Sequence, residues 1–417
     1  MDANDVVEQA ARESYGRLLA FLSARSRDIA AAEDALADAF GAALADWPRS
    51  GVPANPEAWL LTAARRKLVD AARRRQVRDK SMPALLLAAE EAEVLVMEPS
   101  GLADERLKLL FTCAHPAVDA AIRTPLMLQA VLGLDAARIA SAFCISPAAM
   151  ARRLTRAKAR LQEAGIPFEP PEADELAPRL DAVLDAIYAA YGSGWDYVAG
   201  SDPNLRGLAG EAVYLGRLIV TLLPQEPEAR GLLALMLHCE ARRAARRDAH
   251  GAYVPLAEQD CALWSASLAR EAEDQLTEAS HPGRLGRFQL EAAIQSVHAR
   301  RAVTGETDWE GVALLYEGLV RLAPTIGALV GRAAAIGEAR GAEAGLALLW
   351  ELPKTAVASY QPYWALKGHL FAKVGSIAET ADAYGRAIGL CDDPAMRAFL
   401  IARTEEVLSS RSRTRLH

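Results

Sequence analysis

The stretch LDAARIASAFCISPAAMARRLTRAKAR, residues 134–160, determines the fold of its part of the chain. Asp135 opens a short helical segment, and Phe143-Cys144-Ile145 follows as a turn. Ser146 and Pro147 then provide the N-cap and the first residue of a second helix. This order predicts a helix-turn-helix, in which the second helix can enter the major groove of DNA.

The second helix of this pair carries basic side chains and no acidic one up to residue 160. Its N-terminal residues would lie nearest to base edges, and arginine can bind guanine or phosphate through two hydrogen bonds. The predicted duplex-DNA interface consists of Ser146, Met150, Arg152, Arg153, Arg156 and Lys158. An ordinary helical hairpin with a solvated arginine face is the alternative.

A second basic segment, NPEAWLLTAARRKLVDAARRR, occupies residues 55–75. Asn55 is placed to cap a helix that starts at Pro56, after the proline-containing break WPRSGVPANP at 47–56. A stiffened loop followed by an arginine-rich helix suits single-stranded nucleic acid, because the loop can hold an unstacked base while the helix neutralises phosphates. We expect Trp59 to lie in the core, as an aromatic residue on the apolar face of such a helix.

Two further helices are predicted upstream, over residues 6–25 and 29–47. The second begins after Asp28 as N-cap and has Leu36, Phe40 and Leu44 on one face.

The basic charge is concentrated in these two segments. Residues 59–80 carry a net charge of +6 and residues 146–160 a net charge of +5, although the whole chain carries −7. Two basic helices in an otherwise acidic chain are the pattern expected of local nucleic-acid contacts.

The chain of 417 residues is long enough for several domains. We predict a small helical domain at 1–76, a linker at 77–101, a helix-turn-helix domain at 102–165 and a large helical domain at 175–417. In the last domain, WEGVALLYEGLVRLAP at 309–324 resembles part of 363–390. The latter places Gly375 between two helices and fits a tetratricopeptide-like (TPR-like) unit, a stacked helix pair that binds peptides or proteins.

The composition favours an all-α fold: 52% of the residues are hydrophobic but only 6% are aromatic, and no convincing alternating strand pattern stands out. The five cysteines have no metal-ligand spacing, and no signal peptide or membrane span is recognisable. We expect a cytoplasmic protein with no catalytic residues, metal or cofactor. Cys113 and His115 are interpreted as a packed thiol and a helix cap rather than as ligands.

The order of these elements resembles that of the small sigma factors of the extracytoplasmic-function (ECF) group. The resemblance is clearest in AAEDALADAF (31–40), in residues 55–75 and in residues 104–161. It extends to the branch with a C-terminal TPR-like extension through LLPQEPEARGLLALMLHCEARRAAR (222–246), EQDCALW (258–264), QLEAAIQSVHA (289–299) and TDWEGVALLYEGL (307–319). It covers almost the full length.

The resemblance implies a protein that binds core RNA polymerase and directs it to promoter DNA. Polymerase binding would fall to Glu33, Asp34 and Asp38. The minus-ten element would be opened and read by Asn55, Arg65, Arg66, Arg73 and Arg74, and the minus-thirty-five element by the helix-turn-helix. Ala37, Ala149 and Ala151 stand where the family usually has polar residues.

The resemblance further implies that the extension modulates activity, and that a small YCII-like protein or a peptide is a candidate partner for it. The alternative to a sigma factor is a helix-turn-helix DNA-binding regulator or scaffold with a TPR-like protein-binding or sensor domain.

Overall fold

The computed structural model describes residues 3–78, 99–143, 145–169, 171, 173–195, 208–281 and 283–414. Within these ranges the regular structure is helical, with a single isolated β-bridge between Arg247 and Tyr253 and no strand. The all-α prediction is therefore confirmed. Most of the predicted linker at 77–101 lies outside the described residues. The chain divides into two compact units, residues 1–219 and 220–417, which are described separately.

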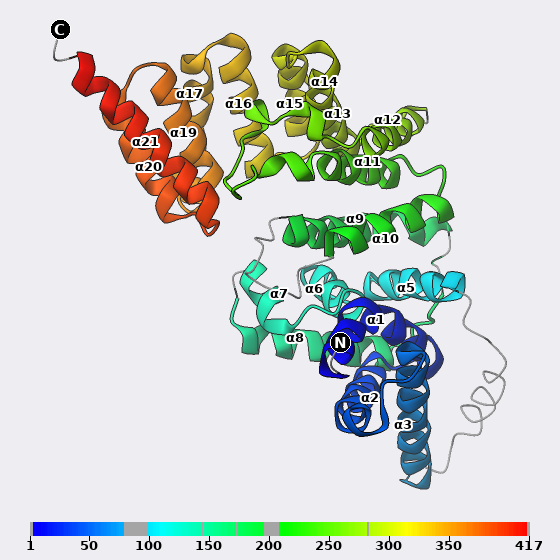
Figure 1. The fold of residues 1–417 in the computed structure, drawn as a ribbon. Helices are drawn as coiled ribbons and strands as arrows, with labels where there is room; N and C mark the ends of the chain where they lie inside the picture. The colour runs from blue at the N-terminus through cyan, green and yellow to red at the C-terminus, as the bar shows by residue number, and fades with distance from the viewer. Residues whose placement is uncertain are drawn as a thin grey trace. The chain divides into compact units, whose positions relative to one another are not determined.

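The first unit begins with three helices, α1 (Ala3–Ser26), α2 (Ile29–Ser50) and α3 (Pro56–Arg78) (Figure 1). Both predicted N-caps are confirmed. The Oδ1 atom of Asp28 accepts a hydrogen bond from the Ala31 N–H at 2.9 Å, and that of Asn55 accepts one from the Ala58 N–H at 3.0 Å. These bonds satisfy backbone donors that the first helical turn leaves unpaired.

Helix α2 extends past its predicted end at residue 47, through Pro48, and stops at Ser50. A proline this near the end of the helix removes only one backbone hydrogen bond, so the helix tolerates it. Gly51 then ends the helix with a φ of 86°, and its N–H bonds to the carbonyl oxygen of Trp47. A positive φ of this kind is the conformation that glycine adopts without strain.

The buried face of α2 differs from the predicted one at its C-terminal end. Leu36 is fully buried, but Leu44, predicted to lie on the same face, is 48% exposed, so the buried face does not follow the four-residue spacing to its end. Ala43 and Trp47 take its place, because a helix of 3.6 residues per turn rotates away from a strict four-residue spacing. Trp59 is half-buried, and its ring meets the buried Trp47 ring edge to face at 5.4 Å, so it packs against the core as predicted without being enclosed in it.

The first unit continues with α5 (Pro99–Cys113), α6 (Ala120–Ala130), α7 (Ala136–Ala142), α8 (Pro147–Glu163), α9 (Ala173–Trp195) and α10 (Leu208–Leu222). Helix α9 packs on α5 and α6, although the sequence predicted that it would belong to the C-terminal domain. The buried guanidinium of Arg106 on α5 pairs with Glu211 on α10, with Nη2 2.7 Å from Oε2.

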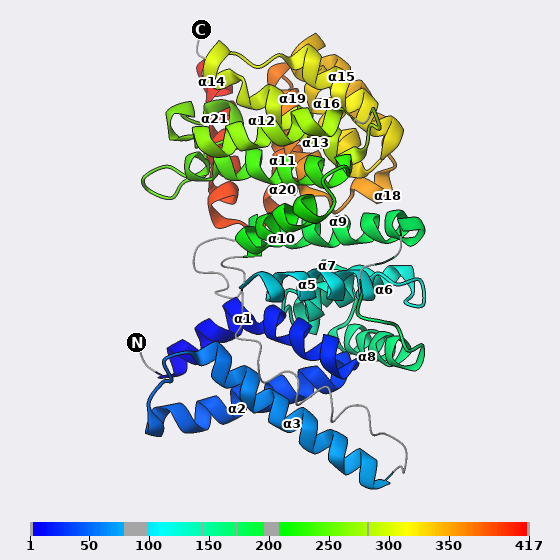
Figure 2. The same ribbon diagram turned by 90° about the vertical axis from the view of Figure 1, so that its right-hand side faces the viewer.

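Helix α1 lies against α5 and α6, as Figures 1 and 2 both show. The approach is closest at Gly16, where an added Cβ atom would lie 1.8 Å from the carbonyl oxygen of Val131. Only glycine allows the α1 backbone to come this near to another backbone segment. The two small domains predicted from the sequence are therefore packed into one unit.

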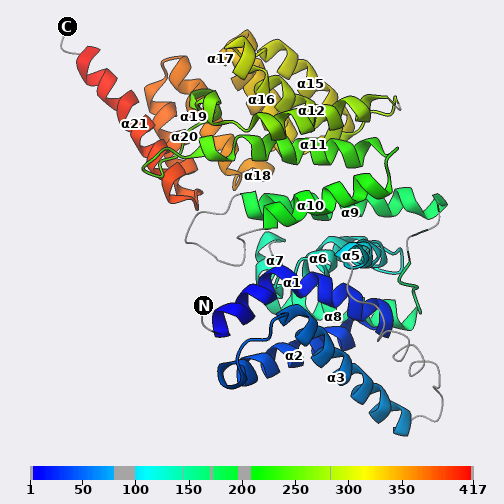
Figure 3. The same ribbon diagram turned by 45° about the vertical axis from the view of Figure 1, so that its right-hand side comes forward.

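The second unit is a succession of helices, most of them packed on a neighbour in the sequence (Figure 3). They are α11 (Pro227–Ala241), α12 (Ala266–Ser280), α13 (Arg287–Ala299), α14 (Arg301–Thr304), α15 (Trp309–Leu322), α16 (Ile326–Arg340), α17 (Ala342–Trp350), α18 (Lys354–Val357), α19 (Gln361–Lys373), α20 (Ile377–Gly389) and α21 (Pro394–Thr414). The 3₁₀ turns η3 (Arg243–Arg246), η4 (Leu256–Glu258) and η5 (Cys261–Leu263) lie between α11 and α12.

The helix pair predicted in residues 363–390 is present as α19 and α20. Gly375 lies between the two helices with a φ of 76°. Tyr384 on the return helix is 5% exposed and packs so closely on Gly368 that an added Cβ would lie 2.5 Å from its ring. The local sequence was sufficient to predict this helix pair, because the pair depends on the turn at Gly375 and on the contact between Gly368 and Tyr384.

Candidate nucleic-acid interface

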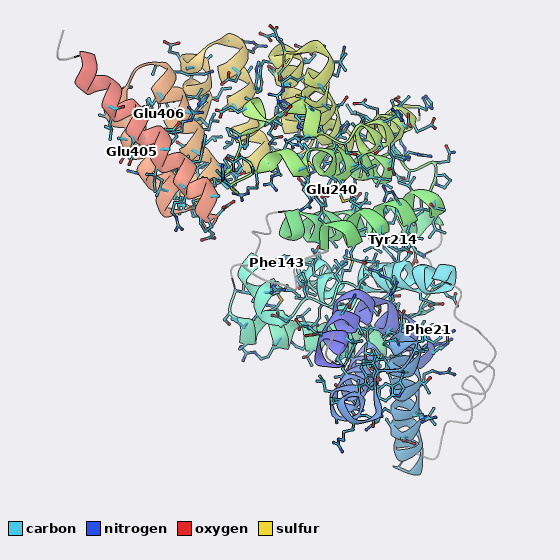
Figure 4. The ribbon with its side chains drawn as sticks, in the orientation of Figure 1. Phe21, Phe143, Tyr214, Glu240, Glu405 and Glu406 are labelled. Carbon is cyan, nitrogen blue, oxygen red and sulfur yellow. The ribbon has the colours of Figure 1, made fainter. Side chains whose placement is uncertain are left out.

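Helices α7 and α8 are joined by a short connection, residues 143–146. Ser146 Oγ accepts a hydrogen bond from the Ala149 N–H at 3.3 Å, as expected of an N-cap, and Pro147 is the first residue of α8. The Ile145 N–H bonds back to the Ala140 carbonyl oxygen at 3.0 Å, which closes the turn. Phe143 is exposed on this connection (Figure 4). Cys144 lies outside the described residues.

Helix α8 has a buried apolar face and an exposed basic one. The buried apolar side chains are Met150, Leu154, Ala157 and Leu161, and the exposed arginines are Arg152, Arg153, Arg156 and Arg160. Within the described part of the chain none of these four arginines makes an ion pair, so their charge is free to meet an anion. Met150 is only 1% exposed, and its predicted contact with a base does not agree with this burial.

The C-terminal half of α8 is attached to the N-terminal end of α2. Lys158 is buried and its Nζ donates to Glu33 Oε2, while Gln162 Nε2 donates to Asp28 Oδ2 at 2.7 Å. Burial raises the pKa of Glu33, and the charge of Lys158 opposes that rise. Lys158, predicted to bind DNA, thus pairs with Glu33, predicted to bind polymerase. The two positions are 125 residues apart, so no local sequence pattern could have predicted this contact.

The other two predicted polymerase contacts lie on the outer surface of α2. Asp34 and Asp38 are both exposed, and Ala37 is exposed between them. Asp38 lies 3.4 Å from Lys67 Nζ on α3, an ion pair between two exposed side chains. Such a pair contributes little stability and is readily exchanged for another partner.

The predicted minus-ten residues lie at the start and along the length of α3. Asn55 is exposed, but its side-chain oxygen is already occupied by the helix cap. Arg66 is exposed, whereas Arg65 is half-buried. The pKa of Arg25 is lowered, mainly by its burial and to a smaller extent by the charge of Arg65. The side chains of the remaining two, Arg73 and Arg74, lie outside those that the structure describes.

Arg25 itself was not predicted from the sequence. Its guanidinium carbon lies 3.4 Å from the centre of the Phe21 ring, a cation–π contact on α1 (Figure 4). The four-residue spacing of Phe21 and Arg25 on one helix was the signal that could have identified the pair.

The Cys113 and His115 pair has the structural role that the sequence indicated. Cys113 is fully buried, and burial raises the pKa of its thiol. His115 Nδ1 accepts a hydrogen bond from the Ala117 N–H at 3.1 Å and so closes the turn after α5. Among the described residues no group of three or more His, Cys, Asp or Glu side chains could hold a metal ion. None of the helices described is both long and apolar enough to cross a membrane.

Comparisons with known proteins match two parts of the chain. Residues 11–78, which form α1 to α3, match the model of sigma-70 region 2. Residues 179–280 match a family of unknown function, DUF6596. An uncharacterized protein of Rhizobium meliloti (strain 1021) is 38% identical over 393 residues, which cover 93% of this chain and 92% of that protein. No solved structure matches the chain.

The similarity to this relative extends over both units of the chain. Sigma-70 region 2 acts in transcription initiation through RNA polymerase and promoter DNA. The chain therefore belongs to the sigma-70 family, with region 2 at its N-terminal end and a large helical domain behind it.

Proposed function

We propose that the chain is a cytoplasmic sigma factor of the ECF group, in the branch with a TPR-like C-terminal extension. It binds core RNA polymerase and directs it to specific promoters. The single observation that carries the proposal is the row of exposed arginines without ion pairs on α8. This row lies in the same compact unit as a sigma-70 region 2 domain.

The proposed polymerase contact is the exposed surface of α2 around Asp34 and Asp38. Leu44, 48% exposed on the same helix, adds an apolar side chain to it. Acidic groups with an apolar neighbour suit a docking helix, because charge directs the approach and apolar burial supplies affinity.

The two DNA contacts are divided between α3 and α8. The loop before α3, with Asn55, would hold a flipped minus-ten base while Arg65, Arg66, Arg73 and Arg74 neutralise phosphates. The exposed Arg152, Arg153 and Arg156, with Ser146 at the helix start, would contact the minus-thirty-five duplex.

The Glu33–Lys158 contact makes this structure a closed form of the proposed sigma factor. The two promoter elements are about 25 base pairs apart, which is about 85 Å of B-form DNA. Helices α2 and α8 touch each other here, so they must separate before both elements are occupied. Separation would also release Lys158 for a phosphate and Glu33 for polymerase.

We further propose that the C-terminal extension modulates this activity. Its stacked helices are of the kind that bind peptides or proteins. The DUF6596 segment begins within the first unit, where Glu211 on α10 pairs with Arg106 on α5. The small YCII-like partner expected from the family resemblance stays a prediction, to which the contacts described here add no support.

Core-enzyme binding tests the polymerase contact. Asp34→Lys together with Asp38→Lys should weaken the affinity of the full chain for core RNA polymerase at least about tenfold, by repulsion at a charged interface. Asp274→Lys on α12, exposed and equally acidic, is the matched control and should leave the affinity unchanged. Equal affinities for all three proteins would remove this part of α2 from the interface.

A further inference from the structure

The C-terminal unit contains a small cavity enclosed by α11, η5, α12, α13 and α14. Its volume is about 140 Å³. Helices α11, α12 and α13, which contribute residues to its wall, pack on one another (Figure 2). The side chains that line it include His238, Arg242, Trp264, Gln295 and His298. They come from segments up to 60 positions apart, so the cavity is a product of the fold rather than of one motif.

Two polar side chains at this cavity have buried atoms without a hydrogen-bond partner among the described residues. His238 is 3% exposed, and neither of its ring nitrogens is hydrogen-bonded. The Nε1 atom of Trp264 is likewise buried and unpaired. Unpaired buried donors are costly, and a cluster of them at a cavity points to a ligand that satisfies them.

The charges around the cavity favour an anion. Arg242 bonds only to neutral groups, Gln295 Oε1 at 2.6 Å and Cys239 Sγ at 3.6 Å. The nearest acid on the same helix, Glu240, is held by two hydrogen bonds from Arg243 instead (Figure 4).

A second guanidinium, that of Arg301, lies over the Trp264 ring at 5.2 Å and bonds to the carbonyl oxygens of Ala257 and Gln259. Neither Arg242 nor Arg301 makes an ion pair within the described part of the chain.

The pKa values of the two histidines are lowered by the same nearby arginines as well as by burial. Burial and then the charge of Arg242 lower the pKa of His238 to about 4. Burial and then the charges of Arg242 and Arg301 lower the pKa of His298 to about 4. Both rings are therefore neutral at neutral pH. A carboxylate outside the cavity lining approaches His238: Glu273 Oε1 lies 3.5 Å from His238 Nε2, too far for a good hydrogen bond, and accepts one from Ser296 at 2.6 Å.

The rest of the cavity wall is made of small side chains and is mostly apolar. It consists of Ala241, Ala266, Ala269, Ala299 and Ala302, together with Cys261 and Ser265. The Ser265 hydroxyl is already hydrogen-bonded, to Ser267 Oγ at 3.1 Å and to the Leu268 N–H at 3.4 Å. A phosphate or sulfate ion would place some of its charged oxygens against the alanine methyl groups, which cannot donate hydrogen bonds to those oxygens. A molecule with one anionic end and a short apolar body fits both halves of the wall. A cavity of about 150 Å³ holds benzene, so the ligand has about six non-hydrogen atoms.

We propose that this cavity is a binding site for a short aliphatic monocarboxylate of about the size of butyrate. The carboxylate accepts hydrogen bonds from Trp264 Nε1, His238 and the Arg242 guanidinium. The aliphatic chain lies against the alanines. The C-terminal unit is thereby a small-molecule binding domain, whether or not the chain acts as a sigma factor.

Isothermal titration calorimetry of the full chain tests the proposal, with butyrate, its neutral isostere butyramide and inorganic phosphate as probes. Butyrate should bind at one site, and butyramide and phosphate at least about tenfold more weakly, because a hydrogen bond to a charged group is the strong one. Absence of butyrate binding, or equal binding of butyramide, would overturn the proposal.

Three variants locate the site. Ala269→Leu should abolish butyrate binding by filling the cavity, whereas Ala378→Leu on the surface of α20 should leave it unchanged. Trp264→Phe keeps an aromatic side chain, although a smaller one, but removes the unpaired donor, and should weaken binding about tenfold. Butyrate affinity that is the same in Ala269→Leu and in the unaltered chain would place binding elsewhere and refute the assignment. Thermal unfolding of each variant in the absence of ligand verifies that it is folded.

Discussion

At the level of single residues, the closest approach in the first unit is made by a residue with no side chain. Gly16 of α1 lies against the Val131 carbonyl, and an added Cβ would be 1.8 Å from its oxygen. Gly41 on α2 has nothing within 4 Å of the same position. The two glycines differ only in their surroundings.

Gly16→Ala should therefore destabilise the first unit by about 1–3 kcal/mol, through overpacking against backbone. Gly41→Ala should stabilise it by about 0.5–1 kcal/mol, since alanine loses less conformational entropy in a helix. Urea unfolding followed by circular dichroism measures both. Equal effects of the two substitutions would contradict the described packing of α1 against residue 131.

His238 makes the stability of the second unit depend on pH. Its pKa is about 4 in the folded chain, through burial and the charge of Arg242, against about 6.5 when unfolded. The unfolded state therefore takes up the proton first as the pH falls, and the stability conferred by the neutral ring is lost between pH 6.5 and 4. Between pH 7 and pH 5 this loss is about 2 kcal/mol.

His238→Phe should reduce the difference in unfolding free energy between pH 7 and pH 5 by that amount. His281→Gln, at an exposed histidine, should leave the difference as it is in the unaltered chain. A His238→Phe variant with an unchanged pH dependence would show that Glu273 or another group titrates in this range instead.

At the level of elements, α8 is a helix with two separate tasks. Its buried face and Lys158 hold it in the first unit, and its exposed arginines make no ion pair within the described residues.

Arg153→Gln with Arg156→Gln should weaken promoter binding by the polymerase complex. The slope of log affinity against log salt concentration should fall by about two units, because each arginine would neutralise one phosphate. Arg270→Gln, exposed on α12, is the control. An unaltered salt slope in the double variant would mean that these arginines do not touch DNA.

The elements also show what a sequence can and cannot predict. Caps at Asp28, Asn55 and Ser146 and the Gly375 turn were predicted correctly, because each depends on residues within about four positions. Leu44 was predicted to share a helix face with Leu36, and Met150 to contact DNA, but Leu44 is 48% exposed and Met150 is buried. Those assignments depend on which face of the helix meets its neighbours, and helix periodicity alone leaves that open.

The candidate sites were harder to predict than the helices. The acidic and basic residues were identified by type and spacing, yet Glu33 and Lys158 pair with each other across 125 positions. The cavity at His238 had no sequence signal, because its lining comes from five segments.

At the level of the whole molecule, the contact between α2 and α8 has to open for promoter recognition. In a chain with Glu33→Cys and Lys158→Cys, a cleavable bis-methanethiosulfonate reagent can link the two thiols, since its spacer replaces the length of the two side chains that meet there. Promoter-dependent initiation should fall at least about tenfold on cross-linking and recover when the same sample is reduced, because the linked helices cannot reach elements about 85 Å apart. Each single cysteine variant, treated in the same way, is the control. Full initiation by the cross-linked form would show that separation is not required.

Run-off transcription is the decisive test of whether the chain is a sigma factor. The assay combines core RNA polymerase, the full chain and DNA from upstream of the chain's own gene. We predict a discrete transcript with both proteins and none with core enzyme alone. A chain that binds duplex DNA without core enzyme yet never supports initiation would contradict the assignment, and would identify a helix-turn-helix regulator instead.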